Sequence, residues 1–158
     1  MGRDVKTAVL LIAHGSRHAA ANDDLFRLAE RLARRGEYAI VEPSFLELAD
    51  PDIPTAGDRC ATLGATRVLM VPYFLSEGVH LVRDLTAARD ALRGRHPGVE
   101  FRLGPALGPH PLLDDLVAVR VRGLDEAPGS FDPSPDLAAL YPPMGGHGPG
   151  GLKGRNPG

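Results

Sequence analysis

The chain has 158 residues, the length of one ordinary domain, of which 43% are hydrophobic and 24% charged, as in a globular protein with a buried core. Its formal net charge of −2 gives no electrostatic reason to expect nucleic acid as a partner. Cys60 is the single cysteine, which excludes an intrachain disulfide and a cysteine cage for zinc or an iron–sulfur cluster.

Four short apolar runs predict strands, and a segment with helical spacing of apolar residues follows each of them. The first and third runs are almost continuously apolar, which is typical of parallel strands buried on both faces. The pattern therefore predicts a single-domain α/β fold with the order βαβαβαβα, a parallel sheet and helices on both faces. In chain order, the predicted elements are a strand at 8–13, a helix at 22–35, a strand at 39–46, a helix at 53–63, a strand at 67–73, a helix at 79–93, a strand at 99–103 and a helix at 111–122.

The composition changes sharply after Leu124. Residues 125–158 contain 7 Pro and 8 Gly among 34 residues and show little apolar periodicity. Such a segment cannot bury enough apolar surface to offset the entropy lost on ordering. We therefore expect residues 1–124 to form the folded domain and residues 125–158 to form a disordered tail.

Two histidines follow the first and third predicted strands. His14 comes directly after the first strand and precedes Gly15, which permits a positive φ or a close backbone approach. His80 lies at the opening of the helix that follows the third strand. If these strands are neighbours, as in a common order of doubly wound sheets, both histidines face one pocket at the carboxyl edge. Neutral imidazoles bind Fe, Co, Ni and Zn, although each histidine alone can equally be a structural residue.

Four other side chains have both a functional and a structural interpretation. Glu47 follows the second strand and can accept protons or complete a metal site, or it can complement the dipole of the next helix. His110 precedes the last predicted helix and either lines the cleft or caps that helix. Arg17 and Arg83 can pair with ligand carboxylates or remain solvated at the surface.

Motifs distributed along the chain carry a resemblance to a known family. Their combination and order resemble the class II chelatases that metallate sirohydrochlorin, most closely the short, single-domain sirohydrochlorin cobaltochelatases and ferrochelatases. The resemblance covers most of residues 8–122 and does not extend to the tail. The motifs are AHGSR, FLELADP, VPYFLSEGVHLVRD and GPALGPHPLLDDL.

This resemblance implies a chelatase-like α/β fold and a specific reaction. The reaction is ATP-independent insertion of a divalent metal, Co²⁺ or Fe²⁺, into sirohydrochlorin in siroheme or cobalamin biosynthesis, without an organic cofactor. Ni²⁺ also suits the expected ligands. The resemblance further implies a homodimer in which two short subunits together form the cleft.

The resemblance also implies roles for individual residues. The metal ligands of the family correspond to His14 and His80, and its acidic residue corresponds to Glu47, so these three are the expected catalytic residues. The expected tetrapyrrole contacts are Arg17, Ser76, Gly78, Arg83 and His110.

Three alternatives remain open at this point. A non-catalytic tetrapyrrole or metal carrier would use the same histidines. A histidine phosphatase also has His-Gly after its first strand, but that motif requires an arginine where this chain has Ala13. The chain can also be one half of a heteromeric chelatase.

The beginning of the chain shows no signal for membrane targeting. Residues 1–6 have no apolar core, and the apolar run at 8–13 is too short to cross a bilayer. We therefore expect a cytoplasmic protein with no membrane partner.

Overall fold

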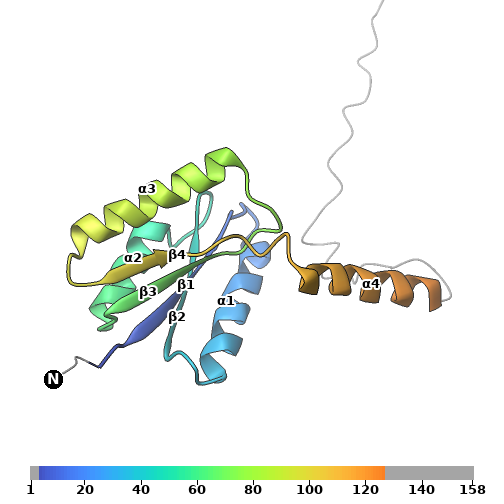
Figure 1. Cartoon of the computed structure of the whole chain (residues 1–158), viewed down its shortest axis with the longest axis horizontal. Helices are drawn as coiled ribbons and strands as arrows, with labels where there is room; N and C mark the ends of the chain where they lie inside the picture. Colours follow the sequence, from blue (N-terminus) through green and yellow to red (C-terminus); the bar gives the residue numbers. More distant parts are fainter. Residues whose placement is uncertain (1–3, 127–158) are drawn as a thin grey trace, which may run out of the picture.

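The computed structural model describes residues 4–126, which form four parallel strands and four helices in the predicted alternating order (Figure 1). The predicted α/β fold is therefore confirmed. The elements are β1 (Thr7–Ala13), α1 (Ala19–Arg34), β2 (Ile40–Phe45), α2 (Ile53–Thr62), β3 (Arg67–Pro72), α3 (Val79–Arg95), β4 (Glu100–Leu103) and α4 (Pro111–Glu126).

The helix boundaries differ from the predicted ones by up to four residues. Helix α1 begins at Ala19, three residues before the predicted start, because alanines extend a helix readily even outside its apolar stripe. Helix α4 continues to Glu126, two residues into the segment predicted as a tail, since no proline follows until Pro128. The rest of the predicted tail, residues 127–158, lies outside the described residues.

The strand order in the sheet is β2-β1-β3-β4, and every pair is parallel. Strand β1 is hydrogen-bonded to β2 on one side and to β3 on the other, which confirms that the first and third predicted strands are neighbours. The carboxyl ends of β1, β2 and β3 therefore meet at one edge, the edge at which ligands bind in open α/β sheets.

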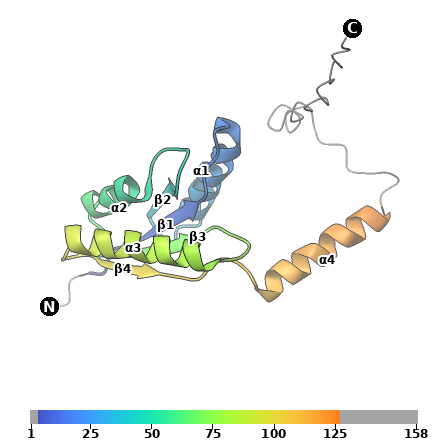
Figure 2. The same ribbon diagram turned by 90° about the horizontal axis from the view of Figure 1, so that it is seen from above.

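Helices cover the sheet on both faces but not to the same extent. Helices α2 and α3 pack on one face, where their side chains meet alternate residues of β1 and β3. Helix α1 packs on the opposite face, against β1 and the end of β2. Burying a leucine or isoleucine in such a layer stabilises the fold by about 1.5–3 kcal/mol. In Figures 1 and 2, α4 extends away from the sheet and from the other three helices.

The short strand β4 forms one edge of the sheet. Phe101 is fully buried under α3, whereas Glu100 and Arg102 are exposed. The Glu100 carboxylate pairs with the Arg67 Nε at 3.0 Å and the Arg102 Nε at 2.7 Å, and these arginines lower the pKa of Glu100. The edge is therefore apolar on the covered face and charged on the other.

Within residues 4–126, no helix has the length and apolar character needed to cross a membrane.

The start of α2 supplies a prediction about stability. Asp52 occupies the N-cap position, and its carboxylate accepts a hydrogen bond from the Thr55 backbone N–H at 2.8 Å. Hydrogen bonds from the Thr55 side chain and backbone lower the pKa of Asp52 below its ordinary value. A lowered pKa in the folded state means that ionised Asp52 stabilises the protein at neutral pH. This contribution is lost as the pH falls from about 4 through the folded-state pKa.

We therefore expect Asp52→Ala to lower the free energy of unfolding by about 1 kcal/mol at pH 7, measured by urea denaturation. The difference from the unsubstituted chain should shrink at pH 3. Asp52→Asn is the matched control, because it keeps a capping oxygen but cannot ionise. Equal urea midpoints for Asp52→Ala and the unsubstituted chain at pH 7 would contradict this role.

Candidate functional site

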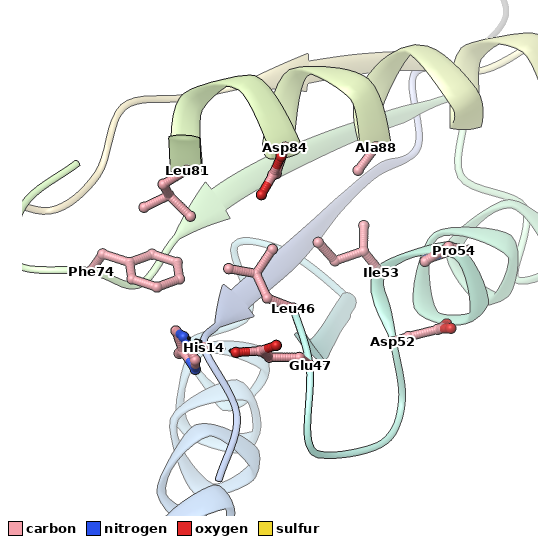
Figure 3. Close-up of a pocket in the computed structure, with 10 residues that line it drawn as sticks. All are labelled: His14, Leu46, Glu47, Asp52, Ile53, Pro54, Phe74, Leu81, Asp84 and Ala88. Carbon is pink, nitrogen blue, oxygen red and sulfur yellow. Dashed lines mark ion pairs between the residues drawn. The ribbon is translucent and has the colours of Figure 1, made fainter. Parts of the chain in front are cut away.

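A hollow lies at the carboxyl edge of the sheet, between α2 and α3. Its volume of about 680 Å³ is within the range of small-molecule sites. Loops after β1, β2 and β3 contribute to its walls together with the two helices (Figure 3). The lining residues are His14, Leu46, Glu47, Asp52, Ile53, Pro54, Phe74, Leu81, Asp84 and Ala88.

His14 and Glu47 form a pair in this pocket. The pairing of β1 with β2 continues past the strand ends, since Leu46 N–H donates to the Ala13 carbonyl at 2.9 Å and Glu47 N–H donates to the His14 carbonyl at 3.0 Å. The two side chains therefore leave the backbone side by side, with His14 Nε2 3.2 Å from Glu47 Oε1 (Figure 3). Their position is fixed by the sheet rather than by a flexible loop.

Gly15 makes this close approach possible. Its φ is +98°, in the left-handed region, and a Cβ at this position would overlap the Glu47 carbonyl oxygen. The sequence predicted either a positive φ or a close approach here, and the structure has both. On the other side of Gly15, Asn22 bonds reciprocally to Ser16, with distances of 2.9 Å and 2.8 Å to the Ser16 N–H and carbonyl.

The chemistry of the His14–Glu47 pair fits a divalent metal. Imidazole nitrogen and carboxylate oxygen are both ligands for first-row metals. Two ligand bonds of about 2.1 Å that meet at about 100° span the observed 3.2 Å between Nε2 and Oε1. Both side chains are more than half exposed, so a metal at this position would stay open to exchange. Among residues 4–126 there is no group of three or more His, Cys, Asp and Glu that could hold a metal.

Asp84 is a pocket residue that the sequence analysis did not identify. It projects from α3 toward the pocket, on the wall opposite Glu47 (Figure 3). Asp84 follows His80 by four residues, a spacing that places both on one side of a helix and that could have indicated it. The apolar side chains Leu46, Phe74 and Leu81 lie around these polar groups. The pocket thus offers carboxylates on two walls and an apolar surface between them.

The predicted residues after β3 lie at the same edge of the sheet but do not line this pocket. His80 is in the first turn of α3, Gly78 is the N-cap of that helix, and Ser76 is in the preceding loop. All three are exposed. The structure therefore brings His14 together with Glu47, while His80 lies outside the pocket lining.

The remaining predicted contacts are dispersed around the site. Arg17 lines a separate hollow beside α1, and Arg83 is exposed on α3, with its Nε 3.6 Å from Asp84. His110 Nδ1 accepts a hydrogen bond from the Leu112 N–H at 3.1 Å, so His110 caps the start of α4. It also lines an apolar hollow along that helix, away from the His14–Glu47 pair.

The chain matches a known protein family over most of its length. A model of the CbiX family matches residues 8–124. The chain belongs to the CbiX family.

Two curated relatives carry chelatase names. A sirohydrochlorin cobaltochelatase from Priestia megaterium is 35% identical over 114 residues, which are 72% of this chain and 37% of the relative. A chloroplastic sirohydrochlorin ferrochelatase from Arabidopsis thaliana is 33% identical over 114 residues, which are 72% of this chain and 51% of the relative. The chain thus spans about half or less of the length of these two relatives.

A solved structure of a CbiX-family protein has the same fold over nearly its whole length. The CbiX protein from Marinobacter aquaeolei VT8 superimposes with a TM-score of 0.66 at 30% sequence identity. The match covers 77% of this chain and 99% of that one. Chains of about one domain are therefore found in this family.

Gly15 provides a test of the site's construction. We expect Gly15→Ala to lower the free energy of unfolding by at least about 1–2 kcal/mol, because an alanine disfavours the left-handed conformation and its Cβ would displace the Glu47 backbone. Urea denaturation measures this change. Gly98→Ala is the matched control, since Gly98 is exposed and a Cβ added to it would meet no other atom within 4 Å. An equal effect of the two substitutions would mean that the approach of the two loops is not tight.

Proposed function

We propose that this protein inserts a divalent metal, Co²⁺ or Fe²⁺, into sirohydrochlorin without using ATP. The observation that carries the proposal is the His14–Glu47 pair, held 3.2 Å apart in a pocket of about 680 Å³. Membership of the CbiX family and the chelatase names of two relatives support the substrate and the metals. Ni²⁺ suits the same ligands and belongs in any test.

In this proposal His14 and Glu47 first receive the metal. A hydrated divalent ion must lose water before it can enter a macrocycle, and an imidazole and a carboxylate can replace two waters in turn. His80 lies at the same edge of the sheet and serves as a second imidazole ligand on the path of the ion. A few exposed ligands hold the metal weakly enough that it can be transferred.

Insertion also requires proton acceptors. The metal forms bonds to the tetrapyrrole nitrogens while two N–H bonds break, so each turnover releases two protons. Glu47 and Asp84, on opposite walls of the pocket, are the carboxylates placed to accept them and pass them to solvent. His14 can accept a proton once its metal has left.

In this proposal the protein binds both the flat apolar ring of the macrocycle and its charged rim. Its flat ring packs against the apolar wall formed by Leu46, Phe74 and Leu81. Its anionic rim is directed toward Arg17 and Arg83, toward His110, and toward the loop that contains Ser76 and Gly78 and ends at the N-terminus of α3.

We further propose that two copies of the chain act together as a homodimer. The support is the resemblance to the short, single-domain chelatases, in which two subunits form the cleft together. A cytoplasmic location stays a prediction.

The decisive test is anaerobic absorbance spectroscopy of sirohydrochlorin in excess over the protein, with Co²⁺, Fe²⁺ or Ni²⁺ added in parallel. We expect metal-dependent conversion well beyond one equivalent, faster than in the absence of protein. His14→Ala and His80→Ala should each lower kcat/KM by about 100-fold or more, because each removes a metal ligand. His18→Ala, at the N-cap of α1 and outside the proposed ligand set, should leave it unchanged.

Other results would change the assignment. Conversion that stops at one equivalent per site would indicate a tetrapyrrole or metal carrier. Unchanged turnover in His14→Ala would contradict the proposed metal site. If the purified chain shows no turnover by itself, a heteromeric enzyme would be favoured.

Asp84 supplies a separate prediction about proton transfer. We expect Asp84→Asn to lower kcat by about 10-fold while KM for sirohydrochlorin stays the same or falls, because the change removes a proton acceptor and a negative charge facing an anionic substrate. Steady-state kinetics separate kcat from KM. Asp90→Asn is the control on the same helix, since Asp90 makes only surface ion pairs with Arg89 and Arg93. A rise in KM with unchanged kcat would show that Asp84 binds substrate instead.

A further inference from the structure

Leu48, the residue after Glu47, has a backbone conformation that leucine rarely adopts. Its φ is +64°, in the left-handed region, and every other positive φ among residues 4–126 belongs to a glycine. In this conformation the Cβ of a residue lies too close to the following carbonyl oxygen. Strain of this kind persists only where the surrounding structure enforces it, and it occurs most often at functional sites.

Backbone hydrogen bonds on both sides of Leu48 enforce this conformation. Before Leu48, the Glu47 N–H donates to the His14 carbonyl at 3.0 Å. After Leu48, the chain returns within three residues to Pro51, whose carbonyl accepts a hydrogen bond from the Phe45 N–H at 2.9 Å. The chain therefore has to turn sharply at the residue that follows Glu47, and the turn at Leu48 keeps the Glu47 carboxylate beside His14.

The turn alone does not require a leucine. Glycine adopts the left-handed conformation without strain, and asparagine does so at little cost. The Leu48 side chain is also 50% exposed to solvent, so it gains only part of the stability that burial would give. A single exposed leucine is common at protein surfaces, but an exposed leucine in a strained conformation is unfavourable in two respects. Both features are explained if a bound molecule covers the side chain.

Leu48 lines a hollow that begins beside the His14–Glu47 pair. The hollow has a volume of about 310 Å³ and lies at the start of α1. Its walls come from residues that follow His14 in one loop and Glu47 in the other, so it adjoins the proposed metal position. Phe26, which is 39% exposed, gives the hollow a second large apolar side chain.

The charged residues of this hollow limit what it can bind. Arg17 is the cation of the lining, and Asp23 and Asp50 are its two carboxylates. A carboxylate group of a ligand would therefore be repelled from the interior, although it can pair with the Arg17 guanidinium, which is exposed. The apolar side chains of Leu48 and Phe26 instead suit the uncharged ring system of a tetrapyrrole.

We propose that Leu48 is a substrate-binding residue. Its side chain packs against the edge of the sirohydrochlorin ring and thereby sets the distance from that ring to the metal held by His14 and Glu47. The contact extends the apolar wall of the neighbouring pocket, to which Leu46 contributes. Because Leu48 directly follows Glu47 and its backbone is fixed, the ring and the carboxylate stay in register. This inference rests on the proposed function and adds a binding contact to it.

The test measures binding and stability in the same variants of the full chain. Leu48→Gly removes both the strain and the side chain. We expect its dissociation constant for metal-free sirohydrochlorin, measured by equilibrium dialysis, to rise by about 10-fold or more. Its midpoint of urea denaturation should stay the same or rise, because glycine tolerates the left-handed conformation. A residue with only a structural role would not combine weaker binding with undiminished stability.

Three further substitutions separate the side chain from the backbone. Leu48→Met keeps an unbranched apolar side chain and should leave the dissociation constant within about twofold of the original value. Leu48→Asn suits the left-handed conformation but is polar, so it should weaken binding as much as Leu48→Gly. Leu63→Ala is the matched control and should leave binding unchanged, because Leu63 is 42% exposed at the end of α2 and lines neither hollow.

Two results would overturn the inference. If Leu48→Gly bound sirohydrochlorin as tightly as the unsubstituted chain does, Leu48 would be a turn residue only. If Leu48→Met weakened binding as much as Leu48→Gly, the apolar character of the side chain would not be what binds the ring.

Binding is measured without metal and without turnover, so this inference and the proposed function can fail separately. Suppose that the unsubstituted chain binds sirohydrochlorin, that Leu48→Gly binds it more weakly, and that neither converts it. This result would reject the proposed function and support the contact at Leu48. Normal conversion together with unchanged binding in Leu48→Gly would do the reverse.

Discussion

The backbone hydrogen bonds on the two sides of β1 are the interactions on which the rest of the structure depends. They continue past the strand ends, with Glu47 N–H bonded to the His14 carbonyl on one side and Tyr73 N–H bonded to the Ile12 carbonyl, at 2.7 Å, on the other. Three loops therefore leave the sheet in fixed register. The spacing of the pocket's polar groups follows from strand pairing, so the core and the site share one framework.

Most of the fold could be predicted from the sequence, because the local sequence patterns agree with one another. The continuous apolar run of β1 and the spacing of leucines in α1 each specify one type of element. Alternation of strands and helices then restricts the sheet to a parallel arrangement with right-handed connections. Only the element boundaries differ from the prediction, as at Ala19, because capping and local propensity rather than apolar periodicity determine where a helix begins.

The site could be predicted less completely from the sequence, because its details depend on how each helix packs against the sheet. The sequence placed His14 and Glu47 at one edge, and their pairing required only strand register. For α3 the spacing places His80 and Asp84 on one side of the helix, but which turn of that side lines the pocket depends on tertiary packing. The apolar pattern of α4 similarly indicates that something covers it, but a pattern within one chain carries no information about which chain does so.

The charged outer side of β4 has a consequence for the behaviour of this protein in solution. An open strand edge is where one chain can add to the sheet of another and begin to aggregate. At β4 the exposed Glu100 and Arg102 place charged side chains beside the edge, and at the other edge β2 contains Pro43, which has no N–H to donate. Both edges are thus poor templates for further strands, which protects a small sheet with one incompletely covered face from growing into fibrils.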